Sequence, residues 1–175
     1  MKNLARRMWR AARLESELYE EVEADRNATG ESATVVLLSA LAAGIGSVAN
    51  GGVEGILWCT VAAFAGWYVW AVVAAFIGTR WLPESETSSD TGELLRTLGY
   101  STAPGVLRLF AVIEPIAGWV FLICSVWMLI AMVVAVRQAL DYRSTLRAVG
   151  VCAIGFPIYA ISILVSLLWV GPWPI

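Results

Sequence analysis

Long apolar runs constrain the fold of this chain more than any other feature of its sequence. Four of them are evident, at residues 33–50, 54–78, 119–136 and 148–170. An α-helix of about 20 apolar residues crosses the hydrocarbon core of a bilayer. The chain is also 59% hydrophobic and 15% charged over 175 residues, which leaves too little polar surface for a water-soluble domain. We therefore predict an all-α, polytopic helix bundle embedded in a membrane.

A fifth, less regular stretch decides the topology. Residues 98–118 read LGYSTAPGVLRLFAVIEPIAG, with two prolines, Arg108 and Glu114 in an apolar background. If residues 103–117 cross the membrane, five crossings place every basic residue on the side of the N-terminus. If the stretch re-enters and leaves by the same face, three arginines fall outside: Arg137, Arg143 and Arg147. The positive-inside rule favours five crossings.

The predicted third span is short. As an α-helix, residues 103–118 rise about 24 Å, against a hydrocarbon core of about 30 Å. Neighbouring helices and local thinning of the bilayer absorb a mismatch of this size. Pro104 suits the first turn of a helix, and Pro115 with Gly118 suits a tight hairpin into the next span.

The chain is accordingly divided into three parts. Residues 1–32 are predicted to form a cytoplasmic amphipathic helical segment, residues 33–170 a five-span transmembrane domain, and residues 171–175 a short external tail. The five spans are predicted at about 33–50, 54–78, 103–117, 119–136 and 148–170, with a polar linker at 83–92. The prediction places the protein in the cell (inner or plasma) membrane, with the N-terminus cytoplasmic and the C-terminus external.

Local signals refine the connections. Asn50-Gly51-Gly52 predicts a tight turn between the first two spans. Asp90 and Glu93 have capping-box spacing, so a short helix is expected from 91 to 98, with Gly99 as a left-handed stop.

The N-terminal segment carries apolar residues at helical spacing: Leu4, Met8, Ala11, Ala12, Leu14, Leu18 and Val22. Its first half is basic and its second half is acidic. Basic residues beside Trp9 suit the headgroups of an anionic membrane, whereas the acidic half suits water or a basic partner. A plain solvated helix is the alternative.

Two charged residues fall inside the predicted third span. Arg108 is expected about one turn from the inner boundary and Glu114 near the outer one, where both side chains can reach the headgroups. We therefore interpret both as boundary anchors. The alternative hypothesis is a polar pathway or proton relay, in which one of them faces the interior of the bundle.

Several classes of chemistry are not predicted. The chain has no histidine, which removes His-ligated metal or haem sites and histidine-based nucleophiles. Ser101 has no evident base, because Lys2 is the only lysine. The three cysteines lie far apart in apolar runs and fit no metal spacing. We predict no catalytic residue, no cofactor and no metal, and the net charge of −2 argues against a nucleic-acid partner.

The chain resembles the Yip-domain family of integral membrane proteins, in its prokaryotic form. The resemblance rests on Gly99-Tyr100 followed by Pro104-Gly105 ahead of the short third span. Further support comes from Trp127 in the fourth span, Arg137-Gln138-Ala139-Leu140 after it, and Leu146-Arg147-Ala148 at the start of the fifth. The resemblance implies a five-helix bundle with a cytoplasmic N-terminus.

Eukaryotic relatives in this family bind Rab-type GTPases and one another in secretory membranes. They carry an Asp-Leu-Tyr-Gly-Pro motif near the N-terminus. The nearest match here, Glu17-Leu18-Tyr19-Glu20-Glu21-Val22, has no Gly-Pro, which argues against a GTPase partner.

The sequence predicts a non-enzymatic membrane adaptor or organising protein. Its expected partners are the lipid bilayer and other membrane proteins or further copies of itself, because small residues such as Ala40 and Gly44 permit close helix contact. The alternatives are a transporter or channel subunit for a small solute, an ion or a lipid, and an accessory subunit of a larger membrane complex.

Overall fold

The computed structural model describes residues 2–46, 48–85, 87 and 89–170. Within these residues the fold is all-helical, with seven α-helices and no strands. The order is α1 (Lys2–Ala12), α2 (Ser16–Ala24), α3 (Ala28–Gly46), α4 (Val48–Phe76), the π-helical η1 (Ile77–Trp81), α5 (Thr91–Ser101), the 3₁₀-helical η2 (Ala103–Val112) and η3 (Glu114–Ile116), α6 (Ala117–Ala139) and α7 (Thr145–Val170). The predicted tail 171–175 lies outside the described residues.

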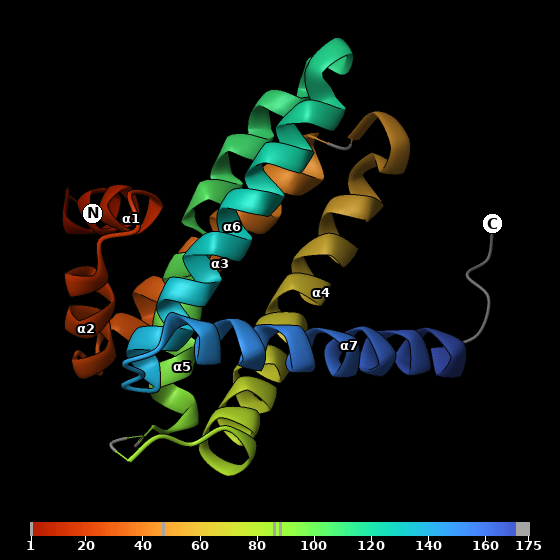
Figure 1. The fold of residues 1–175 in the computed structure, drawn as a ribbon. Helices are drawn as coiled ribbons and strands as arrows, with labels where there is room; N and C mark the ends of the chain where they lie inside the picture. Colours follow the sequence, from red (N-terminus) through yellow and green to blue (C-terminus); the bar gives the residue numbers. More distant parts are fainter. Residues whose placement is uncertain (1, 47, 86, 88, 171–175) are drawn as a thin grey trace.

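Three of the described helical segments are long and apolar enough to cross a membrane: Ala28–Gly46, Thr60–Trp81 and Glu114–Ala139. They correspond to the first, second and fourth predicted spans. Figure 1 shows α3, α4 and α6 running along the long direction of the molecule. The prediction of an all-helical protein is confirmed, and three of the described helices are long and apolar enough to cross a membrane.

The two ends of this bundle differ. We call one the polar end; it holds the described linker residues 82–85, 87, 89 and 90, the start of α5 and residues 140–144, at the bottom of Figure 1. There Glu84 joins the linker to the last helix, because its carboxylate accepts from the Arg143 backbone N–H at 2.9 Å and pairs with Arg147 at 3.2 Å. We call the other the hairpin end; it holds the α3–α4 connection and residues 113–117.

The first connection was predicted at the wrong place. Helix α3 ends at Gly46 and α4 begins at Val48, so Asn50-Gly51-Gly52 lies in the first turns of α4 and not in the turn itself. Both helices therefore start earlier than the predicted spans 33–50 and 54–78. The end of α3 is closely packed: a Cβ on Gly46 would overlap the carbonyl oxygen of Arg108, and one on Gly44 would lie 3.1 Å from the Cα of Ile56.

The predicted third span has a different geometry from the one expected. Residues 103–112 form the 3₁₀ helix η2, which packs between α3 and α6 and reaches the hairpin end. A 3₁₀ helix rises about 2.0 Å per residue, so its ten residues cover about 20 Å instead of the about 15 Å of an α-helix. The tighter coil is also narrower, which suits a segment held closely between two helices.

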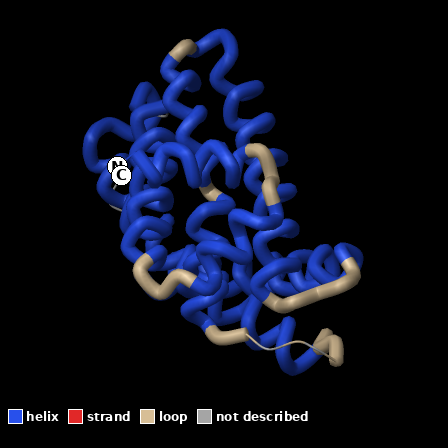
Figure 2. Tube along the Cα trace, turned by 90° about the vertical axis from the view of Figure 1, so that its left-hand side faces the viewer, coloured by secondary structure: helices blue, strands red, loops and turns tan. Residues whose placement is uncertain are grey.

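Helix α7 does not run alongside the other long helices. In Figure 1 it lies across the direction of α4 and α6 at the polar end, and in Figure 2 it points along the line of sight. It contains Pro157, and its described apolar stretch, Thr145–Ile158, is shorter than a full span. The predicted fifth span, 148–170, therefore stays a prediction.

The N-terminal segment is two helices, not one continuous helix. The chain breaks after α1, where Leu14 adopts a positive φ of 62°, and α2 folds back so that the acidic half meets the basic half. Both helices pack against α5 and α6. The segment 1–32 is thus continuous with the core, and α3 begins within it, at Ala28.

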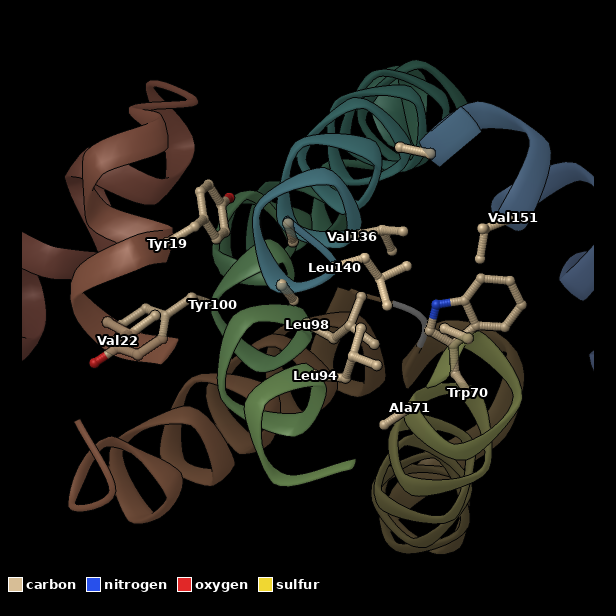
Figure 3. Close-up of a cluster of buried hydrophobic side chains, with 14 of the residues drawn as sticks. Tyr19, Val22, Trp70, Ala71, Leu94, Leu98, Tyr100, Val136, Leu140 and Val151 are labelled. Atoms are coloured by element: carbon tan, nitrogen blue, oxygen red, sulfur yellow. The ribbon is translucent and has the colours of Figure 1, made fainter. Parts of the chain in front are cut away.

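A single apolar cluster joins the N-terminal helices to the bundle. Figure 3 shows Tyr19 and Val22 of α2 facing α5, and Leu140 of α6 between Leu98 and the Trp70 side chain. Because α5 lies at the centre of this cluster, it is the element that positions the residues described next.

Candidate functional site

Helix α5 and the start of η2 carry the motif singled out in the sequence: Gly99, Tyr100, Pro104 and Gly105. The capping box predicted at Asp90 and Glu93 is present, with Glu93 N–H donating to the Asp90 carboxylate at 2.8 Å and the Asp90 N–H donating to Glu93 at 2.9 Å. All four of these motif residues are buried, at the junction of α2, α3, α5 and α6.

Gly99 does not end the helix. Helix α5 continues to Ser101, and Gly99 has ordinary helical geometry, so its predicted role as a left-handed stop is wrong. A Cβ at this position would lie 2.5 Å from the Cβ of Ser32 and 3.1 Å from its carbonyl oxygen. Gly99 is needed because α3 and α5 approach each other there, and Ser32 Oγ donates to the Arg96 carbonyl at 2.7 Å.

Gly105 has a similar role at the start of η2. A Cβ there would overlap Ser39 Oγ of α3 and lie 2.9 Å from Met128 Sδ of α6. The absence of a side chain at Gly105 therefore permits the close approach of α3 and α6 to η2. Pro104 lies in the first turn of η2, where its missing N–H leaves no hydrogen bond unmade.

Tyr100 belongs to a polar network. Its ring is buried, and its hydroxyl donates to Glu31 Oε2 at 2.6 Å. Glu31 in turn accepts from Arg7 at 2.7 Å. Burial, with the hydrogen bond to Glu31, raises the pKa of Tyr100 above its usual value. The tyrosine thus links α5 to α3 and, through Glu31, to α1.

Arg7 is the centre of that network. Besides Glu31, its guanidinium binds Glu21 at 2.8 Å and Asp25 at 3.3 Å. Arg10 extends the network, pairing with Glu21 at 2.6 Å and with Glu15 at 2.9 Å. Arg10 and Arg7 together hold the pKa of Glu21 below its usual range. We call these residues, with Tyr100, the Arg7 network.

Arg96 fixes the end of α2. Its side chain is 7% exposed, and its guanidinium donates to the carbonyl oxygens of Val22 at 3.1 Å and Glu23 at 2.9 Å. Carbonyls in the last turn of a helix have no partner within it. Arg96 therefore supplies hydrogen-bond donors to the last carbonyl groups of α2 and holds this helix against α5.

Glu23 gives this region a dependence on pH. Burial raises its pKa to about 7, and nearby carboxylates, Asp141 foremost, act in the same direction while Arg96 opposes them. Because the pKa is higher in the folded protein than in the unfolded chain, the protonated form favours folding. The contribution of protonated Glu23 to the free energy of unfolding is fully present below about pH 4 and is lost as the pH rises through 7.

We therefore expect Glu23→Gln to melt at a higher temperature than the wild type at pH 8, by an amount corresponding to about 1 kcal/mol after allowance for partial solvation. The difference should shrink as the pH is lowered and vanish near pH 4. Thermal melts of the purified protein from pH 4 to pH 8 measure it. Glu17→Gln, which changes an exposed carboxylate of the same helix, is the matched control. A gain for Glu23→Gln that is independent of pH would contradict the assignment.

A groove with a volume of about 720 Å³ lies in the apolar part of the bundle. It is bounded by α3, α4, α5, η2, α6 and α7, and its surface is mostly apolar. Its polar lining groups are few: Ser39, Ser101, Thr102, Arg108 and Ser125. Pockets of this size accommodate a drug-sized molecule.

Arg108 contacts helix α6. Its guanidinium donates to Ser125 Oγ at 2.9 Å and lies 5.6 Å from the centre of the Phe121 ring. Ser125 is eight residues after the start of the 23-residue helix α6 at the hairpin end. The predicted role of Arg108 as a boundary anchor stays a prediction. Glu114 is exposed at the hairpin end.

The remaining candidate groups have structural partners. Ser101 Oγ donates to the Leu98 carbonyl at 2.7 Å, and Cys124 and Cys152 are buried thiols. Within the described residues, no cluster of three or more metal-binding side chains occurs.

Sequence reasoning missed Arg7, Glu31, Arg96 and Ser125. One signal was available for Arg96: it lies three and four residues before Gly99 and Tyr100, so all three share a face of α5. That face meets α2 and α3. Arg7 can pair with Glu31 only because α2 folds back against α1, and no local sequence pattern predicted that reversal.

Comparisons with protein-family models, with curated proteins and with solved structures find no match to this chain. The resemblance to Yip-domain proteins therefore rests on the residues quoted above.

Proposed function

We propose that this chain is a non-enzymatic integral membrane adaptor, which presents the folded N-terminal helices to a protein partner in the cytoplasm. The observation that carries the proposal is the Arg7 network. It ties α1, α2, α3 and α5 together through side chains that are charged or polar. A surface held in one conformation loses little conformational entropy when it binds.

The exposed side of α1 supplies the recognition surface in this proposal. Arg6 and Trp9 of α1 are exposed, with Trp9 at 64%, and so is Arg13, which follows α1 directly and whose N–H donates to the Trp9 carbonyl; their spacing of three and four residues places them on one face. Tryptophan and arginine are enriched among the residues that dominate binding energy in protein interfaces. We call this the α1 face, and its positive charge suits a partner with an acidic surface.

The proposed orientation follows from the positions of the arginines. Arg80, Arg96, Arg137, Arg143 and Arg147 belong to elements that meet at the polar end. Under the positive-inside rule that end faces the cytoplasm. The resemblance to Yip-domain proteins supports the same orientation of the N-terminus. In the proposal, residues 148–170 form the fifth span on the strength of their apolar sequence, which places the C-terminus outside.

Site-directed photocrosslinking in living cells tests the adaptor role. A photoreactive amino acid in place of Trp9 is expected to capture a cytoplasmic protein, and the double variant Arg6→Glu, Arg13→Glu should reduce that yield several-fold. Matched controls place the same probe at Ile113, exposed at the hairpin end, and at Leu122, exposed on α6. Capture of lipid alone at position 9, or the same protein at all three positions, would contradict the proposal.

A further inference from the structure

The groove between the helices has features that the adaptor role does not use. Its floor is α3, and its two sides are α4 and α6. Exposed residues at its edges, Ala62 of α4 and Val126 and Leu129 of α6, are apolar. In a membrane the groove therefore opens onto lipid acyl chains. A polar group that enters the groove loses its hydration, whereas an apolar chain has no such cost.

Arg108 is the one cationic residue among the described residues that line the groove. The guanidinium of Arg108 has one hydrogen bond to Ser125 Oγ and one ring contact with Phe121, while its Nε is buried without a hydrogen-bond partner in the described structure. None of the described residues that line the groove is acidic. Arg108 is half-buried, and a positive charge without a counter-ion is costly in an apolar setting.

An anionic group beside Arg108 removes that cost. A carboxylate accepts two hydrogen bonds from a guanidinium in parallel, and such charge-assisted bonds are among the strongest in proteins. The hydroxyl of Ser125 lies at the same place and supplies one more polar contact. The chemistry of the groove thus combines one anion-binding point with a long apolar surface.

The volume limits the ligand further. About 720 Å³ is the space of a drug-sized molecule, which corresponds to one acyl chain with a small headgroup and not to a two-chain phospholipid. Leu98 of α5 and Phe156 of α7 extend the apolar lining of the groove.

We propose that the groove is a binding site for a single-chain amphiphile with a carboxylate headgroup, of the fatty-acid class. The carboxylate binds Arg108 and Ser125, and the hydrocarbon chain lies along α3 between α4 and α6. This site is independent of the α1 face, so either assignment stands if the other fails.

The test uses the full-length protein in a non-ionic detergent and oleate as the probe. Native mass spectrometry and thermal shift are expected to show saturable binding of oleate, and oleyl alcohol, which has the same chain and no charge, should bind at least tenfold more weakly. Arg108→Met should reduce oleate binding at least tenfold without changing the weak binding of oleyl alcohol. Ala63→Phe, which fills the groove away from Arg108, should weaken both.

Equal binding of oleate and oleyl alcohol to the wild type would overturn the proposal, and so would undiminished oleate binding by Arg108→Met. If Arg108→Met does not fold, the comparison of the two ligands on the wild type and on Ala63→Phe still decides. Binding of oleate that is unaffected by Ala63→Phe would place the ligand elsewhere and refute the site.

Discussion

Replacing Gly99 with alanine is expected to destabilise the protein by about 2 kcal/mol or more, the upper part of the range for overpacking a core. The added Cβ would lie 2.5 Å from the Cβ of Ser32 and 3.1 Å from its Cα and carbonyl oxygen. Two of these neighbours are backbone atoms of a helix, so rotation of a side chain cannot relieve the overlap. Helices α3 and α5 must move apart, which also lengthens the bond from Ser32 Oγ to the Arg96 carbonyl.

The sign of this effect makes the experiment informative. In an unhindered helix, glycine to alanine stabilises by about 1 kcal/mol. Gly30→Ala is the matched control, because a Cβ there meets nothing within 4 Å, and it should melt at or above the wild-type temperature. Folded yield and melting temperature in detergent measure both variants. If Gly99→Ala has the same melting temperature as Gly30→Ala, the close approach of α3 and α5 is refuted.

Replacing Arg96 with leucine is expected to release α2 from the bundle, at a cost of about 3 kcal/mol. Hydrogen bonds from a charged donor contribute about 1.5–3 kcal/mol each, and Arg96 donates to two carbonyls at the end of α2. Leucine leaves those carbonyls buried without their donor. Helix α2 carries Glu21 of the Arg7 network, and Glu15 and Asp25 flank it, so its release should loosen α1 as well.

Limited proteolysis reads out this release directly. Arg96→Leu should be cleaved between α1 and α3 at protease concentrations that spare the wild type, and its melting temperature should fall by several degrees. Arg143→Leu, which removes an exposed arginine at the same end, is the matched control and should behave like the wild type. Equal protection of all three proteins would show that Arg96 does not hold α2.

The apolar pattern predicted the parts of the fold that depend on local sequence. The helical class, the long apolar helices and the capping box at Asp90 are local properties, and the structure contains all of them. The role of Gly99 was wrong because a glycine near a helix end has two uses, a left-handed stop or a close contact. Only the position of Ser32, far away in the sequence, distinguishes them.

The candidate groove was not predictable for a related reason. Arg108 was expected near a boundary because the third span was counted as an α-helix. A 3₁₀ helix advances further per residue and turns each side chain by about 120° instead of about 100°, so both the depth and the direction of Arg108 change.

The contacts that hold the N-terminal helices set an order of assembly. Val22 and Arg96 are 74 residues apart, and the Trp127 indole N–H, which donates to the Ala12 carbonyl, lies 115 residues after it. A ribosome releases the N-terminus first, so α1 and α2 wait through the synthesis of most of the chain before their docking surface exists. Throughout that interval the apolar side of α1 is open to any chaperone or targeting factor at the ribosome exit. The helices that are made first can complete their tertiary contacts only after α6 has been made.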